Sequence, residues 1–439
     1  MIRRYSAVST SPSRVRAACS RSVPAGLGLG LIVTSVCVLL VAGGCGGEGG
    51  GGVEGRILLV GIDSADWNVI DPLLAEGRLP NLQKLVESGV SCRLHSLEPK
   101  QKSPTIWATI ATGKYPEKHG IGDYIDPNSR NLMPSNMRRA RTFWDIVGES
   151  GRSVTVIGWL VSWPAEPVNG YMVTDYFRYP PREDRPLPEH LTYPDELLPE
   201  VESLRVTTNE ITDAELEPLI ELDAALTSEE AQRLPIEDMF KEMRAINSLS
   251  TMVNSLRDIV AGDRTFLGVA LELMRRRPTD VSVVYLRGVD TASHKFWASA
   301  HPGEVGFPVA QTDARVFGST VSRYYRYADE MLGQLLDEFG EGTVIVCSDH
   351  GFEGPKPGQN PGGINDHGPI GILVLNGPAF RNGERIGEQR VEDVAPTVLA
   401  LCGLPVGEDM DGSVIEDAFE PAFLSSNPVR IIETYERTE

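Results

Sequence analysis

Short apolar segments rich in Val and Ile alternate along the chain with segments that have helical periodicity. The apolar runs are bounded by Gly, Asp or Pro and have the length of strands that are buried on both faces. They cover residues 56–62, 153–158, 281–286, 343–348 and 372–377. The helical patterns cover residues 80–88, 105–112, 142–149, 265–275, 319–338 and 393–402. This alternation predicts an α/β fold with a mostly parallel central sheet flanked by helices.

Residues 180–262 interrupt the strand and helix rhythm. Residues 178–215 are crowded with Pro and charged residues, and residues 213–261 have the pattern of acidic amphipathic helices with little β-branched content. We therefore expect a largely helical cap inserted into one catalytic core, which comprises residues 56–179 and 263–439. Because α/β folds bind ligands at the carboxyl ends of their strands, we expect the cap to lie over that edge of the sheet.

The N-terminal segment has a composition of its own. Residues 1–44 contain five Arg and no acidic residue, and residues 25–44 are apolar and uncharged. This is typical of a secretory signal peptide. Small residues directly precede Cys45, as in a bacterial lipoprotein signal, although Ala42 stands where Leu is typical. We expect an exported lipoprotein held in a membrane through lipidated Cys45 and facing the periplasm or the cell exterior, with residues 45–55 as a Gly-rich tether.

An uncleaved membrane anchor is the alternative for this segment, since about 20 apolar residues can span a bilayer. The chain as a whole carries 41 Lys and Arg against 61 Asp and Glu, a formal net charge of −20. Such a charge repels polyanions, so we expect no binding to nucleic-acid polymers. An anionic substrate would need local positive charge, which a metal ion could supply.

Asp and His residues follow several of the predicted strands. A single Asp after a strand is more often a helix cap, and a single His is more often a surface or hydrogen-bonded core residue. Their joint placement favours a site, because the carboxyl ends of parallel strands meet at one edge. The residues concerned are Asp63, Asp290, His294, Asp349, His350 and His367. Three Asp and three His suit Zn²⁺, with Mn²⁺ or Fe as substitutes, and two such ions about 4 Å apart can activate a nucleophile.

Ser103 is the candidate nucleophile. It lies just ahead of the predicted helix at 105–112, where backbone N–H groups and the helix dipole favour a phosphate or an oxyanion. A hydroxyl next to a divalent cation loses its proton more easily. The alternative is that Ser103 only caps this helix ahead of Pro104.

Five motifs occur in order along the chain: GIDSADW, KSPTIWATIATGKYPEKHGI, YLRGVDTASH, SDHGF and NDHGP. Together they resemble the alkaline phosphatase superfamily and, within it, the type I phosphodiesterase/nucleotide pyrophosphatase family. The resemblance implies an alkaline phosphatase-like sandwich with one Zn²⁺ on Asp290, His294 and His367 and another on Asp63, Asp349 and His350. It also implies that Ser103 bridges toward the second ion and forms a covalent phosphoryl intermediate, which water then hydrolyses.

The same alignment sets limits on the resemblance. It places the family's Thr nucleophile on Ser103, and Thr105, two residues later, stays as the alternative. The sulfatase signature is not met, because Thr105 and Trp107 stand where that signature has Pro and Arg. The family also has an Asn after the HGI motif that binds a phosphoryl oxygen, whereas this chain has Gly122, Asp123 and Tyr124 there.

From these residues we expect a metal-dependent hydrolase of phosphodiesters or phosphate monoesters that acts on a small substrate. Nucleotide diesters, phospholipid head groups, and phosphonate or sulfate esters all remain open, because the selecting surface would be the cap, which has no readable motif. Two alternatives remain: a phosphotransferase or mutase on the same core, and a surface lipoprotein that serves as a binding module without turnover.

Overall fold

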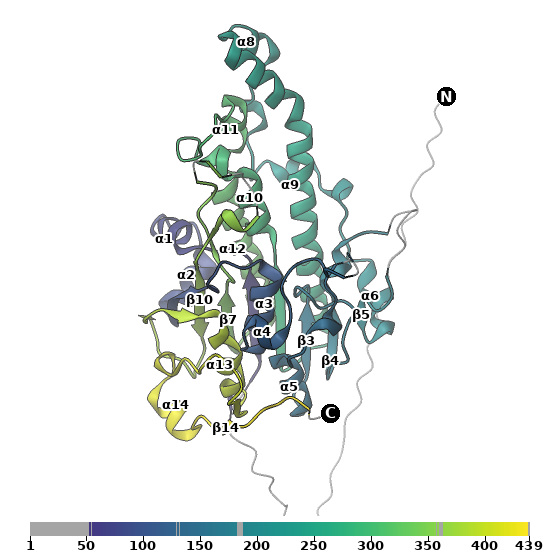
Figure 1. Cartoon of the computed structure of the whole chain (residues 1–439), viewed down its shortest axis with the longest axis vertical. Coiled ribbons are helices and arrows are strands. Elements are labelled where there is room, and N and C mark those ends of the chain that lie inside the picture. Colours follow the sequence, from purple (N-terminus) through teal and green to yellow (C-terminus); the bar gives the residue numbers. More distant parts are fainter. Residues whose placement is uncertain are drawn as a thin grey trace, which may run out of the picture. The chain divides into compact units, whose positions relative to one another are not determined.

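The computed structural model describes residues 52–53, 55–128, 130, 132–181, 188–356, 358–359 and 363–437 (Figure 1). The predicted signal peptide at 1–44, Cys45 and most of the predicted tether lie outside these residues. Within the described ranges, no helix is both long enough and apolar enough to cross a membrane.

A central sheet of ten strands runs through the described part of the chain. Its order is β11 (Glu384–Arg385), β2 (Val90–His95), β10 (Ile370–Asn376), β7 (Thr343–Cys347), β1 (Ile57–Ile62), β6 (Val281–Leu286), β3 (Val154–Ile157), β4 (Gly170–Val173) and β5 (Thr192–Tyr193), with β12 (Gln389–Arg390) also beside β2. Strands β7, β1, β6, β3 and β4 are parallel, whereas β10 is antiparallel to both β7 and β2. The predicted α/β fold with a mostly parallel sheet is therefore confirmed.

Helices cover both faces of this sheet, and β1 shows why. Leu58, Val60 and Ile62 belong to one buried cluster, while Ile57 and Leu59 belong to the other, because successive side chains of a strand point to opposite faces. The first cluster includes side chains of α1 (Trp67–Ala75), α2 (Pro80–Glu87), α9 (Ile236–Arg276), α10 (Gly288–Ala300), α11 (Gln311–Phe317) and α12 (Thr320–Phe339). The second includes side chains of α3 (Ser103–Thr112), α5 (Phe143–Glu149), α13 (Val394–Leu401) and α14 (Pro421–Ser426).

The predicted insertion at 180–262 is largely helical. It contains α6 (Leu198–Glu202), α7 (Asp213–Leu216) and α8 (Ser228–Gln232), and it continues into α9. Figure 1 shows α9 extending from the sheet toward α8. Helix α9 has 41 residues and is therefore about 60 Å long. The predicted boundary at 262/263 lies inside this helix, so the insertion and the core share one continuous element.

Candidate active site

The predicted Asp and His residues converge at the carboxyl edge of the central strands. Two groups have ligand atoms that all lie within 4.8 Å of one another: Asp290, His350 and His367, and Asp63, Asp349 and His350. His350 thus belongs to both groups. His294 adjoins the first group, since its Nε2 lies 3.2 Å from Asp290 Oδ1 and 3.2 Å from His367 Nε2.

Local structure explains how each residue reaches this edge. Asp63 directly follows β1. A single residue, Arg287, separates the end of β6 from the start of α10, where Asp290 and His294 lie one helical turn apart on one face. A short antiparallel pairing of β8 (Gly351–Phe352) with β9 (His367–Gly368) brings His367 back beside β7. As a result, the rings of His350 and His367 stack with centroids 3.6 Å apart.

The site concentrates buried carboxylates, each of which has an oxygen without a hydrogen-bond donor. Asp63 Oδ1, Asp290 Oδ1 and Asp349 Oδ2 accept no hydrogen bond from the described residues. Burial raises the pKa of Asp63 and of Asp349, and the charges of neighbouring carboxylates raise both further. For Asp290, burial also acts to raise the pKa, but the close contact with His294 and the charges of the neighbouring histidines outweigh it and lower the pKa to about 2.

The histidines complete a donor set that suits a cation. Burial and the charge of His350 lower the pKa of His367 to about 2, which leaves its ring neutral with a lone pair available. Uncharged imidazole and unpaired carboxylate oxygens are the ligands that divalent transition metals prefer. The residues therefore fit the divalent metal ions that the family resemblance implies.

Three further side chains orient these groups, and sequence reasoning did not assign them this role. Trp107 Nε1 donates to Asp63 Oδ2 over 3.1 Å, and the Tyr285 hydroxyl donates to the same oxygen. On the other side, His294 Nδ1 lies 3.0 Å from Asp366 Oδ2. Trp107 is fully buried, as expected for a core residue, but it also acts as a donor. Asp366 directly precedes His367 within the NDHGP motif, which is the signal that could have identified it.

Ser103 is the first residue of α3 and is buried beside the cluster of Asp and His residues described above, called here the metal-type cluster. Its Oγ lies 3.3 Å from His350 Nε2. The residue before it, Lys102, occupies the N-cap position, and α3 has no side-chain cap. The interpretation of Ser103 as a helix cap is therefore wrong. Thr105 is also buried, but its Oγ1 has no hydrogen-bond partner among the described residues.

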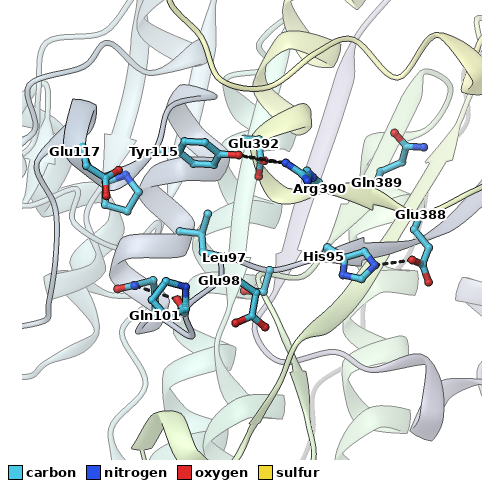
Figure 2. A pocket seen from close by; sticks show the side chains of 13 residues that line it. His95, Leu97, Glu98, Gln101, Tyr115, Glu117, Glu388, Gln389, Arg390 and Glu392 are labelled. Carbon is cyan, nitrogen blue, oxygen red and sulfur yellow. Dashed lines mark hydrogen bonds and ion pairs between the residues drawn. The ribbon is translucent and has the colours of Figure 1, made fainter.

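A polar hollow of about 590 Å³ lies beside the segment that leads into Ser103 (Figure 2). Its walls include His95 at the end of β2, Gln101 and Tyr115. His95 Nε2 lies 2.7 Å from Glu388 Oε2, and the Tyr115 hydroxyl donates to Glu392 Oε1 over 2.7 Å. These side chains pair with one another, so we assign this hollow no role.

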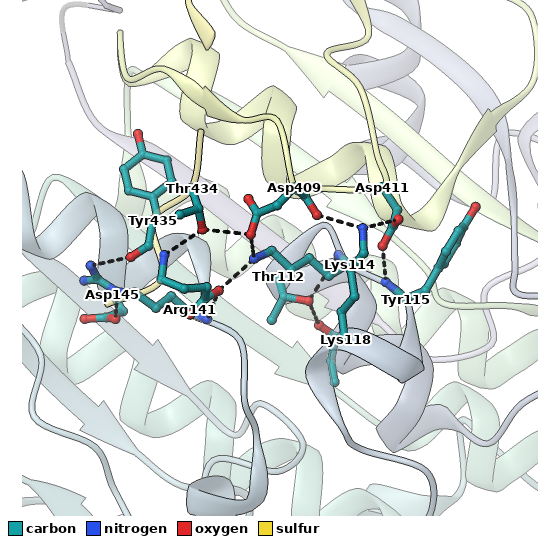
Figure 3. Close-up of polar contacts among 12 residues, drawn as sticks. Thr112, Lys114, Tyr115, Lys118, Arg141, Asp145, Asp409, Asp411, Thr434 and Tyr435 are labelled. Carbon is teal, nitrogen blue, oxygen red and sulfur yellow. Dashed lines mark hydrogen bonds and ion pairs between the residues drawn. The ribbon is translucent and has the colours of Figure 1, made fainter. Parts of the chain in front are cut away.

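The far end of α3 is tied to the C-terminal segment by ion pairs (Figure 3). Lys114 has a side chain only 4% exposed, and its Nζ contacts Asp409 Oδ2 at 2.5 Å and Glu436 Oε1 at 2.8 Å. Lys118 Nζ contacts Asp411 Oδ1 at 2.6 Å from a side chain that is 46% exposed. These contacts fix the turn that follows the helix carrying Ser103.

We expect Lys114→Met to lower the free energy of unfolding by about 2–4 kcal/mol, because it leaves two carboxylates facing each other without a cation. Chemical denaturation of the purified protein measures this change. Lys118→Met is the matched control, and we expect it to change the stability by less than about 1 kcal/mol, since its ion pair is solvated. Equal effects of the two variants would contradict this interpretation of Lys114.

A buried carboxylate also fixes the start of α10. Asp263 Oδ1, on α9, accepts from the backbone N–H of Arg287 over 3.0 Å and of Gly288 over 3.1 Å. The Tyr324 hydroxyl donates to Asp263 Oδ2 over 3.0 Å. Asp263 thus satisfies N–H groups at the amino end of α10 that have no partner within that helix. Burial raises the pKa of Asp263 to about 6, although these hydrogen bonds act to lower it.

This raised pKa predicts a stability change with pH. In the unfolded chain this carboxyl ionises near pH 4, whereas in the folded protein it ionises near pH 6. The contribution of Asp263 to the free energy of unfolding is therefore complete below pH 4 and is lost as the pH rises toward 6. We expect wild type to lose about 3 kcal/mol between pH 4 and pH 7 relative to Asp263→Asn, measured by urea unfolding. Asp258→Asn is the control on the same helix, because Asp258 is exposed. Parallel pH profiles for wild type and Asp263→Asn would contradict the prediction.

Comparison with known proteins supports the motif analysis. Residues 57–369, more than two thirds of the chain, match the family model of type I phosphodiesterase/nucleotide pyrophosphatase. A stretch of 96 residues is 37% identical to the 2,3-bisphosphoglycerate-independent phosphoglycerate mutase of Cereibacter sphaeroides, covering 20% of this chain and 18% of the mutase. The chain therefore spans about a fifth of the length of the curated relatives it matches.

Solved structures resemble the fold at low sequence identity. A putative sulfatase from Bacteroides thetaiotaomicron has a TM-score of 0.52 at 10% identity, over 87% of this chain and 76% of the sulfatase. Murine ectonucleotide pyrophosphatase/phosphodiesterase 5 has a TM-score of 0.47 at 13% identity, over 84% of this chain and 100% of that protein. On the family match, the chain belongs to the type I phosphodiesterase/nucleotide pyrophosphatase family.

Proposed function

We propose that the protein hydrolyses a small phosphate ester in two steps, with Ser103 Oγ as the nucleophile at a site for two divalent cations. The observation that carries the proposal is the position of Ser103 Oγ, 3.3 Å from His350 Nε2. The same nitrogen lies 3.5 Å from Asp63 Oδ1 and 3.4 Å from Asp349 Oδ2. A buried hydroxyl therefore faces a cluster whose composition suits a metal.

Asp290, His294 and His367 would hold one cation, and Asp63, Asp349 and His350 the other, with Ser103 facing the second. The mixed oxygen and nitrogen donors favour Zn²⁺, with Mn²⁺ and Fe as alternatives. Bound divalent cations supply the positive charge that favours an ionised hydroxyl and a negatively charged phosphoryl group. The unpaired oxygens of the three Asp residues support this assignment.

The chain's own residues set up both steps. Ser103 Oγ loses its proton to solvent and bonds to phosphorus as the leaving group departs and takes up a proton. Water then adds to phosphorus, the Oγ–P bond breaks, and Oγ regains a proton. Because Ser103 starts α3, the positive end of the helix dipole lies beside the phosphoryl oxygens. The hydrogen bonds from Trp107 and Tyr285 hold Asp63 in place during both steps.

Metal analysis and turnover of two reporter substrates test this proposal. We expect about two divalent ions per chain, and hydrolysis of bis-p-nitrophenyl phosphate that a chelator abolishes and Zn²⁺ restores. The ratio to p-nitrophenyl phosphate hydrolysis then separates a diesterase from a monoesterase. A protein that binds no metal and turns over neither substrate after addition of Zn²⁺ or Mn²⁺ would leave only the binding-module alternative.

Phosphoryl transfer to an alcohol is the second candidate, since the mutase of Cereibacter sphaeroides resembles part of this chain. Product analysis in the presence of an acceptor alcohol separates the two, because a transferase forms a new ester where a hydrolase releases phosphate.

We also propose that Cys45 is the lipidated N-terminus of an exported protein. Small residues before this Cys and the apolar segment at 25–44 support the proposal. Membrane fractionation of Cys45→Ser tests it, because that variant should move to the soluble fraction.

A further inference from the structure

A small cavity of about 110 Å³ lies beside Pro104, the residue that follows Ser103. Pro104 and Tyr124 line it next to Ser103, and Tyr285 and Arg287 line it from the end of β6. Pockets that enclose larger organic ligands have volumes of roughly 300–1,000 Å³. The cavity therefore has room for a small group and not for a nucleoside.

Arg287 is the unusual member of this cavity. Burial acts to lower the pKa of its guanidinium, but charge interactions with Tyr285, Tyr124, Tyr179 and Asp290 raise it. The structure records no hydrogen bond or ion pair from this guanidinium to any described side chain or carbonyl. The side chain is only partly buried, but its partial removal from water still favours an ionic partner. A guanidinium that lines a cavity and has no partner among the described residues is available to an anion from outside the chain.

The other cations near the cavity already have partners. Arg178 also lines the cavity, but its Nη2 contacts Asp258 Oδ2 at 3.1 Å. Lys102, beside Ser103, has its Nζ 2.6 Å from Asp123 Oδ2. Arg287 therefore differs from its neighbours in having a charge available for a ligand.

The carboxylates of the metal-type cluster do not replace this missing partner. Asp290 is the one whose charge acts on Arg287, and its nearest ionic contact is His294 Nε2 at 3.2 Å. With cations bound to the Asp residues, as in the proposed function, their negative charge is neutralised. Arg287 then adds positive charge to a site that already attracts anions.

Tyr124 supplies a donor at the same place. It lines the cavity next to Arg287, and the charge of Arg287 acts to lower the pKa of its hydroxyl against the larger effect of burial. It stands in the segment after HGI where the family resemblance places an Asn. The Tyr285 hydroxyl, by contrast, is already engaged with Asp63.

We propose that this cavity binds a second oxyanion of the substrate, a carboxylate or phosphate on the part that Ser103 does not attack, with Arg287 as its charge partner and the Tyr124 hydroxyl as a second donor. Guanidinium groups suit this task because their planar fork matches both oxyanions. The proposal rests on the proposed function, since it takes the attacked phosphoryl group to lie at Ser103. It narrows the substrate class to phosphate esters that carry an additional negative charge.

Matched phosphonates test the proposal by binding, independently of turnover. Isothermal titration calorimetry on the Zn²⁺-loaded protein would compare ω-carboxyalkylphosphonates, with one to three methylenes, against alkylphosphonates in which a methyl replaces the carboxylate. A second series ending in a phosphonate distinguishes a carboxylate from a phosphate as the preferred anion. We expect wild type to bind the best ligand with two anionic groups about tenfold or more tightly than the alkylphosphonate that matches it. Hydrogen bonds to charged groups contribute this much to affinity.

Arg287→Gln should reduce the ratio of the two affinities, ligand with the second anion over alkylphosphonate, to about one. The affinity for the alkylphosphonate itself should stay unchanged. Arg178→Gln is the control, since Arg178 lines the same cavity but is already paired, and it should keep the wild-type ratio. Equal binding of both ligands by wild type, a ratio that survives in Arg287→Gln, or an equal loss for both ligands in that variant would overturn the proposal. If wild type turned over the reporter substrates but bound both ligands equally, only the oxyanion site would be refuted. If wild type preferred the ligand with the second anion but showed no turnover, only the proposed hydrolysis would be refuted.

Discussion

Replacing Ser103 by Ala is expected to lower kcat by about 10⁴-fold or more, while metal content and the midpoint of thermal unfolding stay near the wild-type values. Removal of a hydroxyl nucleophile has effects of this size because no neighbouring group takes its place. The folded protein should tolerate the change, since α3 has no side-chain cap to lose. Steady-state kinetics with bis-p-nitrophenyl phosphate and metal analysis on the same preparation give both readouts.

Thr105→Val is the matched control for this prediction. Thr105 lies two residues later on the same helix, and its Oγ1 has no hydrogen-bond partner among the described residues, so the isosteric change should preserve turnover within a few-fold. If instead Thr105→Val abolished turnover and Ser103→Ala retained it, Thr105 would be the nucleophile. Loss of metal from Ser103→Ala would show that the hydroxyl helps to hold the cation.

The second large effect is expected for Asp349→Asn. We expect the metal content to fall from about two ions per chain to about one, and turnover to fall by about 10³-fold or more, because a lost ligand removes several kcal/mol of charge stabilisation. In the metal-free protein obtained by chelation, by contrast, the same substitution should increase stability. Burial and the charges of Asp63 and Asp290 raise the pKa of Asp349 in the metal-free site, so removing its charge should make the chelated protein more stable than chelated wild type.

Asp66→Asn provides the comparison for this variant. Asp66 is also buried close to the site, but it caps α1 through the N–H of Asn68 and accepts from the N–H of Phe352. We expect it to keep both cations, as measured by mass spectrometry. If Asp349→Asn retained two cations and full turnover, Asp349 would not be a ligand.

The extent to which the fold could be predicted depended on the kind of signal. Strands β1, β6 and β7 are continuous apolar runs, which identify a buried strand but carry no information on its direction. The antiparallel orientation of β10 therefore could not be predicted. Strand β2, VSCRLH, mixes polar and apolar residues and was missed. The unbroken α9 was also missed, because Gly262 and Asp263 look like a helix end.

The candidate site could be predicted further than the fold around it. The convergence of Asp63, Asp290, Asp349 and the histidines followed from their position after strands, and the structure brings them together. The sharing of His350 between the two groups could not be foreseen, since it depends on the pairing of β8 with β9. The bond from Tyr285 to Asp63 likewise joins residues 222 positions apart.

The continuity of α9 has a mechanical consequence. This helix begins in the predicted insertion, and in its second half Asp263 accepts from the first N–H groups of α10, which carries Asp290 and His294. Long helices curve gently, and their sharp kinks occur mainly at Pro, which α9 does not contain. A displacement of α9 would therefore move the amino end of α10, and with it Asp290 and His294.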